Sequence, residues 1–225
     1  MRALLTLLAL VSLPALATGL NDTGVTACYD GANMVACTTA NAGNAALYPS
    51  QDARYGRDAA QAAGQLPAKI GGGAAGFDFT PLDASGNVIA LTGTPPVPAA
   101  TPACTRDNVT GLIWEVKTAA NMNDTFTWAN AAHYASNTNS AGLCGAHSGW
   151  RIPTRRELLS IVHRGTNSPA IDTNYFPNTA SYWFWSSDVY APDPAYAWSV
   201  FFRYGYSDAD FRGSGVHVRL VRSGQ

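Results

Sequence analysis

Hydrophobic and polar residues alternate along several short stretches in the second half of the chain, and such alternation is the signature of a strand with one buried face. The range 111–117 shows it first, with Trp114 on the face predicted to be buried. No helical period appears after Gly165, so the later strands should pair with one another in an antiparallel arrangement. These later strands are predicted at 183–187, 197–202 and 216–222.

A helical spacing appears before these strands. In the range 128–135, apolar residues recur at i, i+3, i+4 and i+7, which predicts an amphipathic helix. Asp124 has a side chain suited to capping the N-terminus of this helix. We expect the helix to run to about Ser136.

A second helix is predicted from its start signal. The run Thr154-Arg155-Arg156-Glu157 is a capping box, in which the Thr154 hydroxyl accepts from the third amide and Glu157 reaches back to the cap. Gly165 is expected to end this helix. Its buried face should consist of Leu158, Ile161 and Val162.

The part of the chain before these elements has a less regular pattern and is rich in Ala and Gly. Residues 77–82 alternate, 83–87 have turn composition and 88–91 return to apolar residues, so a β-hairpin is predicted there. A disordered spacer is the alternative. The overall order therefore predicts an α+β fold, with two helices packed on antiparallel sheets and an irregular, hairpin-containing N-terminal extension.

The first residues have the pattern of a signal peptide. Arg2 precedes an apolar stretch at 3–13, and Ala15-Leu16-Ala17 is a typical cleavage site. An uncleaved anchor is the alternative, but no second apolar run follows, so no membrane-spanning helix is expected. The predicted organisation is a signal peptide at 1–17, the extension at 18–103 and a folded domain at 104–225.

Cysteine usage agrees with export. The chain has four cysteines, an even number that favours disulfides outside the cytoplasm. Several pairings are possible, and we favour Cys28–Cys37 with Cys104–Cys144 because the first pair closes a short local loop. A zinc site is disfavoured because no C-x-x-C occurs and the histidines are scattered.

Charge excludes one class of partner. Only 13% of residues are charged, about half of the usual ~25%. The formal net charge is -1, whereas nucleic-acid binding requires a basic excess. The surface must instead be built from Asn, Thr, Ser, Gly and Tyr, which is common outside the cell.

Three motifs in a fixed order carry a family resemblance. The segments Asp107–Glu115, Trp150–Leu158 and Val218–Arg222 together resemble the Legionella collagen-like protein C-terminal domain family. The resemblance implies a variant of the C-type-lectin fold, which formylglycine-generating enzymes and tropism-determining phage receptor proteins also have. It further implies a surface role, since some members are adhesins that bind sulfated polysaccharides. Within the motifs, Trp150 and Arg151 are expected to be structural.

Catalysis is not expected. Formylglycine-type chemistry needs cysteines late in the domain, and none follows Cys144. G-x-S-x-G and H-E-x-x-H motifs are also missing. Asn121, Asn123 and Asp124 could offer oxygen ligands to calcium, but no acidic cluster with loop-like spacing occurs. We therefore predict neither a metal nor a cofactor.

The range 188–215 combines aromatic, acidic and basic residues. The tryptophans Trp114, Trp185 and Trp198, by contrast, are expected in the core. Tyr supplies rigid contact area, and Asp and Arg supply directional hydrogen bonds, so this mixture suits a recognition surface. An ordinary hydrated loop is the alternative. An anion site is conceivable if Arg203, Arg212, Arg219 and Arg222 share a face. The candidate ligand-binding residues are Tyr190, Asp193, Tyr196, Arg203, Tyr204, Tyr206, Asp208, Asp210 and Arg212.

These observations predict an exported, non-catalytic binding module located in the periplasm, at the cell surface or in the medium. It would be an adhesin or receptor-binding domain that recognises an external glycan or protein through its last strands. The alternative is a structural subunit of a pilus or envelope assembly, in which the extension contacts other subunits.

Overall fold

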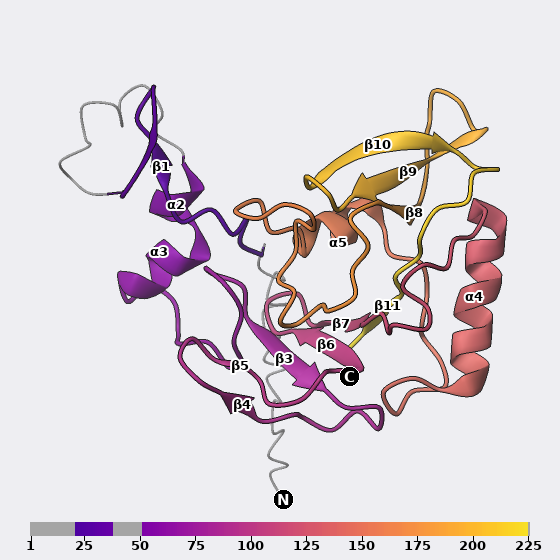
Figure 1. Ribbon diagram of the computed structural model, residues 1–225, viewed down its shortest axis with the longest axis horizontal. Coiled ribbons are helices and arrows are strands. Elements are labelled where there is room, and N and C mark those ends of the chain that lie inside the picture. The colour runs from indigo at the N-terminus through magenta and orange to yellow at the C-terminus, as the bar shows by residue number, and fades with distance from the viewer. Residues whose placement is uncertain (1–20, 38–50, 225) are drawn as a thin grey trace, which may run out of the picture.

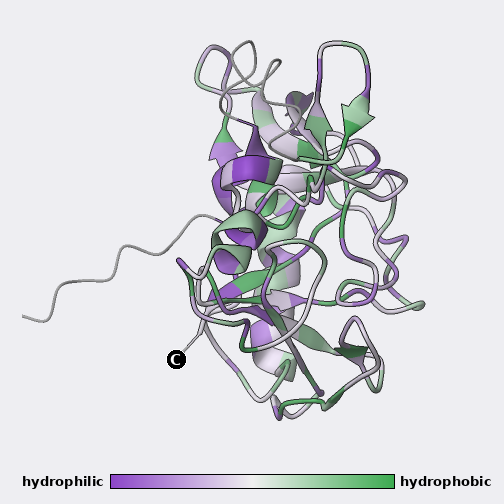
Figure 2. Ribbon diagram, turned by 90° about the vertical axis from the view of Figure 1, so that its left-hand side faces the viewer, coloured by the Kyte–Doolittle hydropathy of each residue, from purple (hydrophilic) through white to green (hydrophobic). Residues whose placement is uncertain are grey.

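The computed structural model describes residues 21–37 and 51–224, so the predicted signal peptide at 1–17 lies outside the described residues. One flank of the protein carries small elements near the N-terminus (Figure 1). They are the strands β1 (Cys28–Tyr29) and β2 (Met34–Val35) and the helices α2 (Asp52–Tyr55) and α3 (Arg57–Ala62). Seen from this side, hydrophilic and hydrophobic stretches are interspersed (Figure 2).

The centre of the protein is a four-stranded sheet in the order β11-β7-β6-β3, and all of its pairs are antiparallel. Its strands are β3 (Phe79–Leu82), β6 (Cys104–Asp107), β7 (Leu112–Glu115) and β11 (Val221–Ser223). The sheet thus joins residues from both sides of position 103, because β3 comes from the predicted extension.

The hairpin predicted around the turn at 83–87 is only partly present. The turn exists, and Asp83 Oδ1 accepts hydrogen bonds from the Ser85 and Asn87 amides. Beyond a single bridge between Leu82 and Val88, however, β3 pairs with β6. Every residue of β3 is buried although it is an edge strand, and Phe79 and Leu82 pack in the core. The following strand β4 (Leu91–Thr92) pairs instead with β5 (Val97–Pro98).

A second, three-stranded antiparallel sheet has the order β10-β9-β8. It contains β8 (Trp183–Val189), β9 (Tyr196–Phe201) and β10 (Tyr206–Phe211), so the strands predicted at 183–187 and 197–202 are confirmed with shifted ends. The strand predicted at 216–222 is confirmed only at its end, by β11. Before it, Val216 and His217 form isolated bridges to Phe126 and Phe184 as the chain passes between the two sheets.

Helices α4 (Trp128–Ala141) and α5 (Arg155–Ser160) accompany the sheets. The cap predicted at Asp124 is wrong. Thr127 caps α4, its side chain accepting from the Asn130 amide at 3.3 Å, and the helix extends past Ser136 to Ala141.

The capping box of α5 is confirmed. The Thr154 hydroxyl accepts from the Glu157 amide at 3.2 Å, and Glu157 Oε2 accepts from the Thr154 amide at 2.7 Å. The end predicted at Gly165 is wrong, because α5 stops at Ser160 with Ile161 as its C-cap. The Gly165 amide donates to His163 Nδ1 instead.

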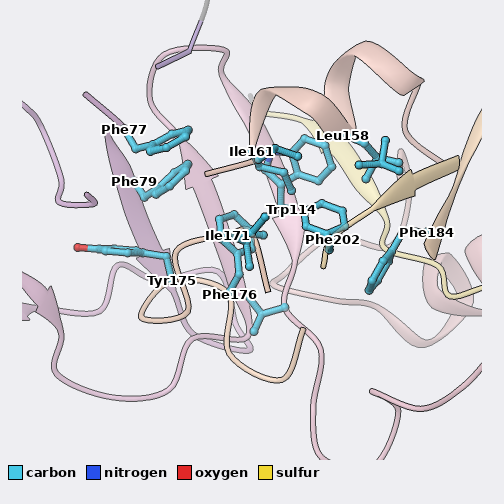
Figure 3. Packing of buried hydrophobic residues seen from close by; sticks show 14 of the residues in the cluster. Phe77, Phe79, Trp114, Leu158, Ile161, Ile171, Tyr175, Phe176, Phe184 and Phe202 are labelled. Carbon is cyan, nitrogen blue, oxygen red and sulfur yellow. The ribbon is translucent and has the colours of Figure 1, made fainter. Parts of the chain in front are cut away.

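Buried side chains form a core with two clusters. The first lies between the sheets and α5 and includes Phe77 and Phe79, whose rings stack at 5.3 Å, together with Trp114, Leu158, Phe176, Phe184 and Phe202 (Figure 3). The second cluster lies beneath α4 and contains Trp150, Trp185, Val216, Val218 and Leu220. These arrangements confirm the α+β class.

Both predicted disulfides are present. Cys28–Cys37 connects the ends of the β1–β2 segment. Cys104–Cys144 ties β6 to the loop that follows α4. Across the described ranges, 21–37 and 51–224, no helix has the length and apolarity that crossing a membrane would require.

Candidate functional site

Each face of the β8–β9–β10 sheet is covered by the core along only part of its length, and the covered part differs between the two faces. On one face, Phe184 and Val200 are covered by the first core cluster, while Trp198 lies toward the surface. On the opposite face, Trp185 and Ala197 are covered by the second cluster. The uncovered half of this second face carries a group of aromatic side chains.

We name this group the aromatic cluster. Phe201 lies at its centre, and its ring stacks on Trp183 with centroids 4.5 Å apart. Edge-on contacts join Phe201 to the other three rings at 5.4–6.1 Å. The members of the aromatic cluster are Tyr182, Trp183, Phe201, Tyr204 and Tyr206.

Strand register brings the aromatic cluster together. Phe201 of β9 is directly opposite both Tyr206 of β10 and Trp183 of β8, and opposite residues project to the same face. A tight turn adds Tyr204, because the Gly205 amide donates to the Phe201 carbonyl at 2.8 Å. Gly205 has φ of 79°, and a Cβ there would come within 2.5 Å of Val162 Cγ1, so this turn requires glycine.

The tyrosines of the aromatic cluster are exposed although they touch other rings. Tyr182 and Tyr204 each expose 54% of their surface and Tyr206 exposes 46%. Trp183 and Phe201 are half-buried beneath them. The cluster therefore has an apolar base that is fixed in the sheet and a rim of phenol groups that can accept or donate hydrogen bonds.

Two carboxylates continue the same face along β10. Asp208 is opposite Ser199 and Asp210 is opposite Ala197, so both share the face of Tyr206. Burial raises the pKa of the Asp210 carboxyl, and the negative charge of Asp208 adds to the rise. Within 21–37 and 51–224, neither carboxylate has an ion-pair partner.

The two candidate arginines stack on aromatic rings. The Arg203 guanidinium lies 5.3 Å from the centre of the Tyr204 ring, at the edge of the aromatic cluster. Arg212 lies 3.9 Å from the Trp128 ring and donates from Nη1 to the Pro194 carbonyl. Arg203 is exposed, whereas Arg212 is half-buried.

The remaining candidates lie elsewhere. Tyr196 is at the far end of β9 from Phe201 and projects to the opposite face, where it contacts Phe211 at 6.0 Å. Tyr190 contacts Trp198 at 5.2 Å, and Asp193 Oδ1 accepts from the Ala195 amide to hold the connecting loop. The structure thus places Tyr206, Asp208 and Asp210 on one face of the hairpin and Tyr196 on the other.

The arginine cluster considered from the sequence is wrong. Arg219 is fully buried, donating to the Glu115 carbonyl at 2.7 Å and to Thr179 Oγ1 at 2.6 Å. Arg222 lies over the Trp150 ring at 5.5 Å, away from Arg203. A buried guanidinium cannot share an exposed anion site.

Tyr182, Trp183 and Phe201 were not among the predicted site residues. The sequence gives a signal for Trp183 and Phe201. Trp183 starts the predicted strand at 183–187 and Phe201 lies near the end of the predicted strand at 197–202, so the two rings can meet if these strands pair antiparallel. Tyr182 precedes the predicted strand at 183–187, and its proximity to Phe201 depends on strand register, which the pattern alone does not give.

In the segment Trp150–Leu158, Trp150, Arg151 and Glu157 make structural contacts. Trp150 is buried, and Arg151 forms a bidentate pair with Glu157 at 2.6 and 2.8 Å. Burial alone would raise the pKa of Glu157, but the hydrogen bonds from Arg151 and Thr154 lower it and hold this pKa below its usual value. Among the described residues, no group of three His, Cys, Asp or Glu side chains could hold a metal ion.

The sequence matches the model of a known family. Residues 103–222, more than half of the chain, match the model described as the Lcl C-terminal domain, which is the family that the three motifs indicate. No curated protein matches the chain.

Proposed function

The chain belongs to the Lcl C-terminal domain family, and from this membership and the geometry above we propose that it is an exported, non-catalytic module that binds an external glycan on the aromatic cluster. The family is consistent with a secreted or surface-associated domain. The two disulfides are consistent with an extracytoplasmic protein.

The aromatic cluster is the observation that carries this proposal. Exposed apolar surface on a monomer is normally scattered, and a contiguous patch of large rings is typical of binding sites. A sugar ring that covers about 50 Å² of tyrosine surface would gain about 1.3 kcal/mol from burial at about 25 cal/mol per Å². Because Trp183 and Phe201 are held by strand pairing, little conformational entropy is lost when a ligand binds.

Charge around the aromatic cluster favours an uncharged glycan. Asp208 and Asp210 can accept hydrogen bonds from sugar hydroxyls, and Arg203 can donate to them. The same carboxylates would repel a sulfate group placed beside them. Binding should therefore change little when NaCl is raised from about 0.05 M to about 0.5 M.

A glycan-array comparison tests the proposal, with Tyr204→Ala and Tyr206→Ala against the unmodified protein. Tyr196→Ala is the matched control, since it removes an exposed tyrosine from the opposite face of the same sheet. We expect both cluster variants to lose glycan signal and the control to retain it. Equal binding by all four proteins would refute the assignment.

A second candidate function is a structural subunit of a pilus or envelope assembly. It is favoured by exposed apolar side chains on the N-terminal flank, where Tyr55 exposes 72% and Ile70 81% of their surface. Co-purification of the native protein with a surface assembly, reduced in a Tyr55→Ser/Ile70→Ser variant, would support this function. Recovery of the native protein as a free monomer would exclude it.

A further inference from the structure

A cleft lies where the N-terminal segment meets α5, and no residue of the aromatic cluster lines it. Its volume is about 600 Å³, and small-molecule sites usually measure about 300–1,000 Å³. Asn21, Thr23 and Thr110 are among its polar lining residues. The cleft is therefore a separate surface of suitable size for a small ligand.

The floor of the cleft is apolar. It includes Leu112 at the start of β7, Leu159 of α5 and Val162 just after that helix. Val162 belongs to the first core cluster, and Leu112 and Leu159 pack against that cluster while remaining partly accessible. This floor could cover the hydrocarbon part of a ligand without any rearrangement of the core.

The acidic residues of the cleft are already engaged. Glu157 is paired with Arg151 through both of its oxygens. Asp22 is buried, with Oδ1 accepting from the Gly24 amide and Oδ2 from the Arg57 amide, each at 2.8 Å. Neither carboxylate is available to neutralise a base that faces the cleft.

The basic residues of the cleft have no such partners. Arg156 and Arg164 both line it, and both are exposed. In the described part of the chain, neither guanidinium takes part in a hydrogen bond or an ion pair. Each guanidinium therefore presents a free planar array of donors, which matches the geometry of a carboxylate or phosphate group.

We propose that this cleft binds a free amphiphilic anion, whose anionic head group pairs with Arg156 and Arg164 and whose hydrocarbon part covers Leu112, Leu159 and Val162. Charge complementarity selects the head group, and the apolar floor selects the tail. A concave cleft of this size fits a single small molecule, whereas a bilayer surface would require a flat or convex face.

Calorimetric titration with octanoate, below the concentration at which it forms micelles, tests the proposal on the full chain. Octanol and octylamine are matched probes with the same tail and a neutral or positive head. The variant is Arg156→Ala/Arg164→Ala, and the control is Arg203→Ala, which removes an exposed arginine outside the cleft. Both arginines of the variant are exposed, so folding should be unaffected.

We expect octanoate to bind the unmodified protein and the control variant equally, and the double variant about tenfold more weakly or not at all, since two charge-assisted hydrogen bonds are lost. Octanol and octylamine should bind much more weakly than octanoate. The proposal is overturned if octanoate does not bind, if all three probes bind alike, or if the double variant binds octanoate as well as the control does. None of these results depends on glycan binding at the aromatic cluster.

Discussion

Removal of one buried carboxylate, that of Glu115, should destabilise the protein more than most single substitutions. Its Oε1 pairs with Lys117 Nζ at 2.9 Å and accepts the Tyr134 hydroxyl, while Oε2 accepts the Leu220 amide at 2.9 Å. Its main-chain carbonyl accepts Arg219 at 2.7 Å. Lys117 thus depends on the Glu115 carboxylate for its counter-charge, and the same negative charge acts on the nearby Arg219 guanidinium.

These charged groups are buried, so removal of Glu115 should cost much free energy of unfolding. Lys117 and Glu115 each expose only 2% of their surface, and Arg219 exposes none. Burial lowers the pKa of Lys117, against the opposing effect of Glu115, and lowers the pKa of Arg219 to about 10. Breaking a buried pair by removing one partner costs about 3–5 kcal/mol, which is a large part of a typical total stability of about 5–15 kcal/mol.

We therefore expect Glu115→Gln, which keeps the shape and removes the charge, to lower the free energy of unfolding by about 3–5 kcal/mol. Urea titration with the disulfides intact, followed by tryptophan fluorescence, measures this change. Glu115→Gln/Lys117→Met should be more stable than Glu115→Gln alone, because the unpaired ammonium group is gone. A loss below about 1 kcal/mol for Glu115→Gln would refute the view that this carboxylate holds the network together.

Three further predictions concern stability. The double substitution Cys104→Ser/Cys144→Ser opens a disulfide with a sequence separation of 40 and should cost about 4 kcal/mol in urea unfolding, and an unchanged midpoint would contradict this expectation. Burial lowers the pKa of His163 below its ordinary 6.5, so the unfolded state binds more protons and the free energy of unfolding should fall as pH decreases through about 6.5. His163→Asn, which keeps an acceptor for the Gly165 amide, should flatten this fall, and an equally steep pH dependence in the variant would rule out His163 as the cause. Gly24→Ala should lower the melting temperature by several degrees, because φ is 81° and a Cβ would come within 2.4 Å of His163 Nδ1, and a melting temperature equal to that of the unmodified protein would show that the N-terminal segment adapts.

Local signals in the sequence were sufficient for several elements. The capping box at Thr154 and Glu157 depends only on side chains three residues apart, and it is present as predicted. The strands containing Trp185 and Trp198 follow from alternation, and Trp185 is fully buried as expected. Trp198 is only half-buried, because Arg155 covers its ring at 4.0 Å in place of an apolar neighbour.

Features that depend on distant partners were not predictable. The pairing of β3 with β6 competes with the local hairpin at 83–87, and only the packing of Phe79 and Leu82 in the core decides between them. Helix α5 ends at Ser160, ahead of the signal expected from Gly165, and the His163 amide donates to the Ala170 carbonyl outside the helix. Strand β10 escaped prediction because its alternating residues are polar and half-exposed rather than apolar.

Strand register, which the sequence pattern does not give, also decides which candidate tyrosines share a face. Tyr196 and Tyr206 both lie on the β9–β10 hairpin and have the same residue type, but only Tyr196 is separated from Phe201 by an odd number of positions, which places it on the opposite face. Tyr206 is opposite Phe201, and Tyr196 is opposite Phe211 at the other end. A one-residue change of register would exchange the faces of every side chain on the hairpin. Register, rather than composition, therefore decides which tyrosines can meet a ligand together, and comparison of Tyr196→Ala with Tyr206→Ala tests this point directly.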